Sequence, residues 1–190
     1  MHVFINDQEI PTGATAGTTV GEVIEASRMR MDPSAIVTTI TLDGVEFHAG
    51  DEGRYNRRGA SSVQKMVIAT RSPSEFAADK RLGLAEALDS VAERTRLVAV
   101  LLRQSEARSA NGLLAVLMEE LRLTMLLDYQ LSLLAADQPS GARDEIATIA
   151  PQLLKAEEQS DWETLATLLD SDLSPTLDRW AASTRARLAA

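Results

Sequence analysis

Three arginines, Arg54, Arg57 and Arg58, lie close together in the glycine-containing segment 49–62, for which we expect an exposed loop. A guanidinium group keeps its positive charge at any physiological pH and binds carboxylates or phosphates through several N–H donors. The cluster is therefore a candidate site for an anion or an acidic partner. The alternative interpretation is that the three side chains are simply solvated on a surface loop.

Two tryptophans, Trp162 and Trp180, form a second candidate set because each lies at or after an expected helix start near the end of the chain. A large indole ring most often closes a small core. It can also provide the centre of a partner-binding surface. We expect a structural role for both residues and keep partner binding as the alternative.

Other patterns that could support catalysis or metal binding are incomplete. His2 and His48 are the only histidines, cysteine is absent, and no His-Glu-x-x-His pair occurs. The segment 13–19 is rich in glycine and threonine and precedes a helix, but it has no lysine to hold a nucleotide phosphate. The pairs Glu119-Glu120 and Glu157-Glu158 have no Glu-x-x-His partner and are typical of solvated helix faces. We expect no catalytic residue, metal or cofactor.

Charge and hydropathy limit the partners further. The net charge of -9 repels phosphate groups, so we expect neither nucleic-acid nor anionic-membrane binding. The amino terminus has no secretory-signal pattern, and no apolar run approaches the ~20 residues of a membrane-spanning helix. These observations predict a soluble, cytoplasmic protein whose partners are other proteins.

The first 72 residues are expected to form a small β-rich module. Short apolar runs at 3–5 and 8–10 indicate a hairpin, and Thr18 or Thr19 is placed to cap a helix. Residues 35–42 and 45–48 flank Asp43-Gly44, which is a strong hairpin signal, and a last strand is expected within 63–70.

Residues 73–190 are expected to form an antiparallel bundle of four to five helices. Ser72-Pro73-Ser74-Glu75 has the pattern of a capping box and marks the domain boundary, so we expect a helix from Pro73 to at least Leu102. A connection at 108–112, a leucine-rich helix over 112–136 and a loop at 137–141 should follow. Three later expectations concern single residues: a kink or restart at Pro151, a second capping box opening at Ser160, and a chain break or restart at Pro175. The fold class is therefore α+β.

The leucine-rich helix carries apolar residues on more than one face. We expect Leu117 and Leu121 to be buried, and either Asp128 or Tyr129 to face inward and need a hydrogen-bond partner. A helix that is apolar on several sides belongs in the middle of a bundle or in a subunit interface. A homodimer through the helical module is therefore expected, with a monomeric bundle as the alternative.

The order of elements in residues 1–72 resembles a ubiquitin-like β-grasp module. Sulfur-carrier members of that fold end in a Gly-Gly tail, whereas this chain continues into a helix, which removes that function. The segment Asp161–Leu169, followed by Asp172–Leu177 and Trp180, resembles a carboxy-terminal signature of uncharacterised bacterial proteins. In size, acidity and helix content, the helical portion is also similar to chaperones of flagellar or type III export, although the β-rich module departs from them.

Together these patterns favour a non-enzymatic interaction or adaptor protein, with an export-chaperone role as one version. The alternative is a small-ligand or anion binder, or an enzyme, that uses a pocket between the two modules and holds an anion with Arg54, Arg57 or Arg58.

Overall fold

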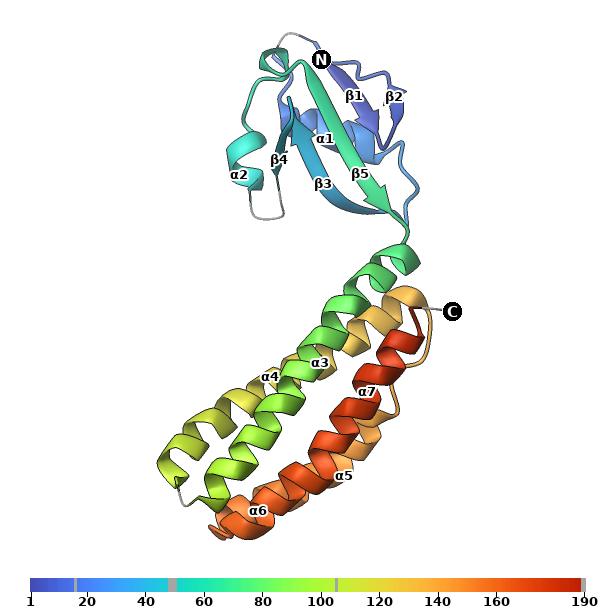
Figure 1. The fold of residues 1–190 in the computed structure, drawn as a ribbon. Helices are drawn as coiled ribbons and strands as arrows, with labels where there is room; N and C mark the ends of the chain where they lie inside the picture. The colour runs from blue at the N-terminus through green and yellow to red at the C-terminus, as the bar shows by residue number, and fades with distance from the viewer. Residues whose placement is uncertain (16, 48–50, 105, 189–190) are drawn as a thin grey trace. The chain divides into compact units, whose positions relative to one another are not determined.

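The computed structural model describes residues 1–15, 17–47, 51–104 and 106–188, so the expectation for His48 lies outside the described residues. The fold is α+β and divides into two compact units, Met1–Phe76 and Ala77–Ala190 (Figure 1). The first unit contains a mixed five-stranded sheet and the second is a bundle of helices, as the sequence predicts.

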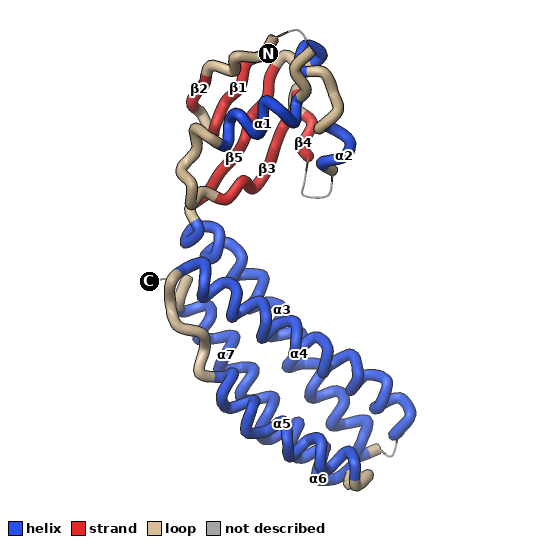
Figure 2. Tube along the Cα trace, turned by 180° about the vertical axis from the view of Figure 1, so that it is seen from behind, coloured by secondary structure: helices blue, strands red, loops and turns tan. Residues whose placement is uncertain are grey.

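The sheet of the first unit has the strand order β2-β1-β5-β3-β4. Its strands are β1 (His2–Ile5), β2 (Gln8–Ile10), β3 (Ile36–Leu42), β4 (Val45–Phe47) and β5 (Lys65–Arg71). The neighbours β1 and β5 are parallel, whereas the other neighbouring strands are antiparallel. Helix α1 (Val20–Arg28) crosses one face of this sheet (Figure 2), which gives a β-grasp-like arrangement.

Local sequence signals position these elements. Thr19 caps α1 through a capping box, in which the Thr19 N–H donates to Glu22 Oε2 (2.7 Å) and the Glu22 N–H donates to Thr19 Oγ1 (3.3 Å). Asp43 and Gly44 have φ angles of 50° and 84°, the left-handed conformations that a tight two-residue hairpin turn requires. Alternate side chains of the strands pack with α1 in the core, including Val3, Ile40 and Met66.

The expectation of an exposed loop over 49–62 is wrong for part of that segment. It contains a short helix, α2 (Glu52–Tyr55), and a 3₁₀ turn at Ala60–Ser62. The Tyr55 side chain is buried, and its ring lies edge-on to Phe47 with the centroids 5.4 Å apart. A single aromatic ring among glycines and charged residues gives no periodic pattern, so the sequence alone does not reveal its burial.

The second unit is built from four long helical segments. They are α3 (Pro73–Arg103), α4 (Ala107–Ala135), α5 (Ala142–Glu158), and a continuous segment made of α6 (Trp162–Leu168), a π-helical stretch at Leu169–Leu173 and α7 (Ser174–Ala186). Helices α3 and α4 lie side by side, and α5 to α7 pack along them (Figures 1 and 2). As predicted, α3 begins at Pro73 after a capping box, because the Glu75 N–H donates to Ser72 Oγ (3.2 Å) and the Ser72 N–H donates to Glu75 Oε2 (2.9 Å).

Several expected breaks are in the wrong place. Helix α4 already begins at Ala107, so the expected connection at 108–112 is helical and Gly112 lies inside α4. Pro151 lies within an uninterrupted α5, and Asp161 rather than Ser160 caps α6 by accepting from the Thr164 N–H (3.1 Å). Pro175 lies in the first turn of α7, as the restart expectation has it, but it does not break the chain, because the preceding turn is a π-helix and the helical path continues.

Within the described part of the chain, no helix has the length and apolar character needed to cross a membrane.

Candidate partner-binding surface

The structure places the three candidate arginines in different local environments. Arg54, at the end of α2, is exposed and lies 3.4 Å from the Asp51 carboxylate. Arg58 donates from Nε to the Ser62 hydroxyl and from Nη2 to the Ser62 carbonyl oxygen, both at 3.0 Å. Arg57 is exposed, and the described residues offer it no hydrogen bond or ion pair. Two of the three guanidinium groups are therefore already paired with residues of the sheet unit itself.

The two tryptophans also differ. Trp180 of α7 is 1% exposed and lies in the core of the helical unit. Its ring offers no surface to a partner, so we remove it from the candidate surface. Trp162 is the first residue of α6 and is half-buried against the same core. Only its accessible edge remains available for contact.

Helix α4 presents the largest set of exposed aliphatic side chains in the described structure. Its inner side is formed by Leu117, Leu121 and Leu131, which are buried, so the expected burial of Leu117 and Leu121 is confirmed. Its outer side carries aliphatic residues that are between 37% and 58% exposed: Val116, Leu123, Leu126, Leu127, Leu133 and Leu134. We call these six residues the α4 apolar face.

A hollow of about 260 Å³ borders this face between α3 and α4. The α3 wall contains the small side chains of Ala87 and Ser90, and the α4 wall contains Leu123 and Leu127. Small residues on one helix opposite leucines on the other leave the leucines accessible from outside. The hollow is thus continuous with the α4 apolar face.

The charged side chain that lines this hollow, Glu120, is incompletely paired. Glu120 Oε1 lies 3.1 Å from the Arg94 guanidinium, which links α4 to α3. The second oxygen, Glu120 Oε2, is buried and has no hydrogen-bond partner among the residues that the structure describes. A buried acceptor without a donor is costly, so a further donor that reached this partly exposed carboxylate would be favourable.

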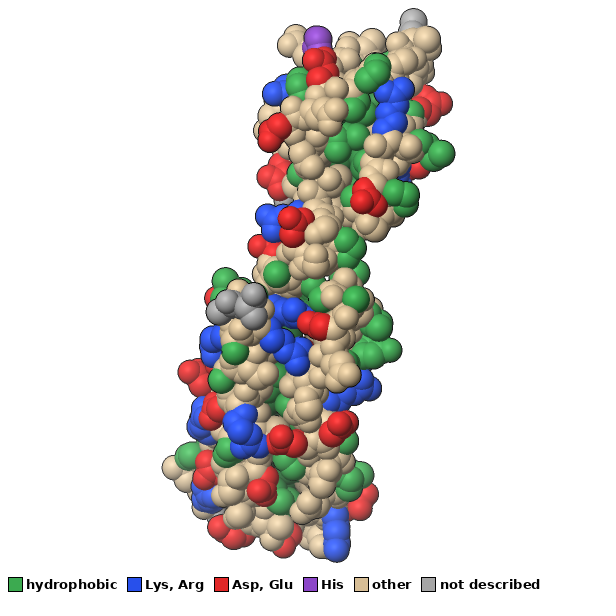
Figure 3. Space-filling model, turned by 90° about the vertical axis from the view of Figure 1, so that its right-hand side faces the viewer, with side chains coloured by type: hydrophobic (Ala, Val, Ile, Leu, Met, Phe, Trp, Pro, Cys, Tyr) green, Lys and Arg blue, Asp and Glu red, His purple; other side chains and the backbone are tan. Residues whose placement is uncertain are grey.

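Other parts of the bundle surface are charged. Arg96 and Arg185 form ion pairs with Asp178 and Asp89 across α3 and α7. The face of the helical unit in Figure 3 shows basic and acidic side chains interspersed. The α4 apolar face contrasts with this charged surface, because its aliphatic side chains form no hydrogen bonds with water.

Glu145 of α5 gives a further example of these charged contacts. It lies 2.5 Å from the guanidinium of Arg179 on α7. The hydrogen bond from Arg179 holds the pKa of the Glu145 carboxyl below its usual value. This ion pair links α5 to α7.

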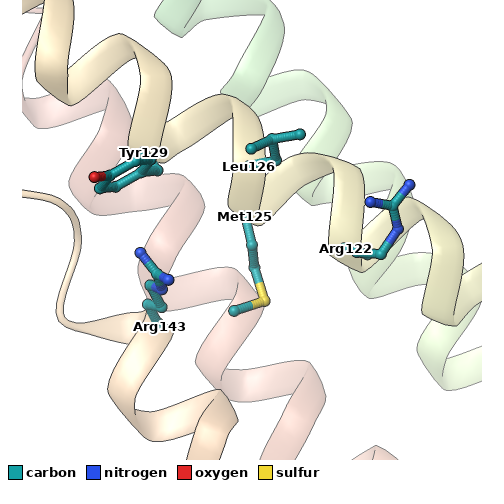
Figure 4. Close-up of a pocket in the computed structure, with 5 residues that line it drawn as sticks. All are labelled: Arg122, Met125, Leu126, Tyr129 and Arg143. Carbon is teal, nitrogen blue, oxygen red and sulfur yellow. The ribbon is translucent and has the colours of Figure 1, made fainter.

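A second hollow, of about 270 Å³, lies beside α4 and α5 and is lined by Arg122, Met125, Leu126, Tyr129 and Arg143 (Figure 4). The Arg143 guanidinium lies over the Tyr129 ring, 5.3 Å from its centroid. Arg122 lies at the other end of the hollow. The two cations do not converge, and Met125 lies between them, so this hollow is a poor cradle for an anion.

Arg122 is already paired with an anion of its own helix. It donates two hydrogen bonds to the Glu119 carboxylate, at 2.7 and 2.8 Å. This contact holds the pKa of Glu119 below its usual value. An external anion would therefore have to displace a carboxylate that Arg122 already binds.

Of the two polar residues considered for the inner side of α4, Asp128 is buried and Tyr129 is exposed. Asp128 Oδ2 accepts a hydrogen bond from the Ser140 N–H at 3.1 Å, which ties the loop after α4 to the helix. Among the described residues there is no cluster of three or more side chains suited to holding a metal ion.

In comparisons with protein-family models, curated proteins and solved structures, nothing matches this chain. The family resemblance expected from the sequence therefore stays a prediction, and the α4 apolar face is the strongest candidate for a binding surface among the described residues.

Proposed function

We propose that this chain is a non-enzymatic interaction or adaptor protein, in which the α4 apolar face binds another polypeptide. The observation that carries the proposal is the accumulation of six exposed aliphatic side chains on one helix of a bundle whose other faces are rich in ion pairs. Single exposed leucines are ordinary on protein surfaces, whereas a continuous group of them is typical of a protein-binding site.

The energetic scale is consistent with protein binding. Burying the exposed half of one such aliphatic side chain contributes about 1 kcal/mol, so the α4 apolar face contributes about 6 kcal/mol. Association costs at least about 4 kcal/mol in lost translational and rotational freedom. A partner must therefore bring a complementary apolar surface of its own, which a polypeptide can do and a small anion cannot.

An export-chaperone role is one version of this proposal, in which the α4 apolar face covers an apolar helix of an exported protein. A cytoplasmic location belongs to the same proposal, supported by the acidic surface and by the charge of -9.

Photo-crosslinking tests the proposal directly. A benzophenone amino acid placed at Leu126, on the α4 apolar face, should crosslink to polypeptide in native cells. The matched control is the same group at Gln152, which is exposed on α5 outside that face and should give little product. The proposal is wrong if Leu126 captures no protein while a small molecule raises the melting temperature of the purified chain by mass action.

A further inference from the structure

We infer that the α4 apolar face is self-complementary and that its partner is a second copy of this chain, with the two α4 helices paired antiparallel about a twofold axis. The inference rests on the proposed function, because it requires the α4 apolar face to bind protein. It adds the identity of the partner, the direction of the pairing and the register.

The spacing of outward-facing residues on α4 is that of a coiled-coil seam. Positions 116, 120, 123, 127, 130 and 134 follow one another at intervals of four, three, four, three and four. They are occupied by Val, Glu, Leu, Leu, Gln and Leu, and none of these side chains is fully buried. Alternation of three and four keeps side chains on one side of a helix and allows two helices to interlock.

The order of apolar and polar residues in this seam is the same in both directions along the helix. When a second α4 is laid antiparallel with Leu123 opposite Leu127, Val116 falls opposite Leu134 and Glu120 falls opposite Gln130. Every apolar position of the seam thus meets an apolar position, and each polar position meets a polar one.

The pairing of Glu120 with Gln130 gives Glu120 a hydrogen-bond donor that a single chain does not provide. Glu120 Oε2 is buried and unpaired among the described residues, whereas the Gln130 side chain is exposed and its amide nitrogen is a donor. In the antiparallel register the Gln130 amide of the second copy lies opposite the Glu120 side chain, which is 34% exposed, and donates to its carboxylate once the carboxyl group turns Oε2 outward. The twofold axis forms this contact twice. A parallel pairing would instead place Glu120 opposite Glu120, where two carboxylates repel each other.

Light scattering and sedimentation across micromolar concentrations test the self-association. The expected result is a mass that approaches twice the 20.6 kDa of one chain as the concentration rises. Gln130→Glu replaces the donor with a second carboxylate opposite Glu120, and should weaken the dimer about tenfold or more. The control is Gln152→Glu, the same change at an exposed position of α5, which should leave the dimer constant unaltered.

Engineered cysteines test the direction of pairing without interference, because the natural chain contains none. In a mixture of Val116→Cys and Leu134→Cys chains the two thiols lie opposite each other across the antiparallel pair and should form a disulfide between copies under mild oxidation. Val116→Cys alone should not, because the two copies of residue 116 would lie about 27 Å apart along antiparallel helices. A parallel dimer would crosslink through Val116→Cys alone.

The inference is overturned by a constant mass near that of one chain, by a dimer that Gln130→Glu leaves intact, or by crosslinking through Val116→Cys alone. If the chain is monomeric and the photo-crosslinker at Leu126 still captures a different protein, the self-pairing fails while the proposed function stands. If Leu126 captures nothing, the proposed function fails as well.

Discussion

Truncation of Leu117 to alanine is the sharpest test of the bundle core. The Leu117 side chain is completely buried in the core of the helical unit, so the variant removes three carbon atoms from a site without access to water. At about 0.8 kcal/mol for each buried methylene-sized group, the transfer contribution alone is about 2.4 kcal/mol. The cavity left behind adds to this, which gives an expected loss of about 2–5 kcal/mol in the free energy of unfolding.

Tryptophan fluorescence in a denaturant titration measures this loss selectively, because both tryptophans lie in the helical unit. The matched control is Leu82→Ala on α3, where the side chain is 54% exposed and the same truncation should cost about 1 kcal/mol. Equal losses in the two variants, or a loss below about 0.5 kcal/mol for Leu117→Ala, would show that the wrong side of α4 has been placed inside.

Three further changes test a cap, a buried carboxylate and a turn. Ser72→Ala should cost about 1 kcal/mol in unfolding free energy by removing the acceptor for the Glu75 N–H. NMR titration should show the pKa of Glu75, which hydrogen bonds from Ser72 hold below its usual value, rising in that variant. Because the folded-state pKa is depressed, this contribution is present above the ordinary glutamate pKa and is lost as pH falls through the folded value. Asp128→Ala leaves the buried Ser140 N–H without an acceptor, so denaturant titration should show a loss of about 1–3 kcal/mol in the free energy of unfolding. Amide hydrogen exchange in the loop 137–141 should also become faster. Gly44→Ala should cost about 1–2 kcal/mol because Gly44 has a φ of 84°, whereas Gly83→Ala in open space on α3 should stabilise by about 1 kcal/mol; thermal unfolding followed by circular dichroism separates these outcomes.

Two expectations based on local chemistry were confirmed. The left-handed pair Asp43-Gly44 and the capping box at Ser72 are determined by neighbouring residues, so a short stretch of sequence is enough to predict them. The burial of Leu117 was also predictable, because a helix period fixes which side chains share a face. These signals give the order of elements and much of the core.

Features that depend on distant parts of the chain were harder to predict from the sequence. Burial of Tyr55 requires Phe47 and the rest of the sheet unit around it, and no pattern within 49–62 indicates this. For the candidate site, the sequence showed that the leucine-rich helix was apolar on several faces. It could not say which leucines the other helices would leave exposed, such as Leu123 and Leu127. That distinction needs the packed bundle.

The π-helical stretch at Leu169–Leu173 has a consequence for the tolerance of this chain to deletions. Buried positions here follow at four-residue steps, from Leu165 to Leu169, Leu173 and Leu177. In a regular α-helix each such step rotates the side chain about 40° further around the axis, so the three steps would move Leu177 far from the direction of Leu165.

The wider π turn absorbs this drift, because its i→i+5 bonds accommodate one residue more in a turn. Loss of a single exposed residue there, such as Ser171, would restore an ordinary helix and make the local backbone more regular. Leu165 and Leu177 would then be eleven residues apart, which is about three turns of α-helix, so the later side chains would keep their directions and Trp180 would stay in the core that it now fills. In this segment the irregular turn holds one residue more than a regular helix needs, so the bundle should tolerate its loss, whereas the same deletion in the regular part of α7 would turn every later side chain by about 100°.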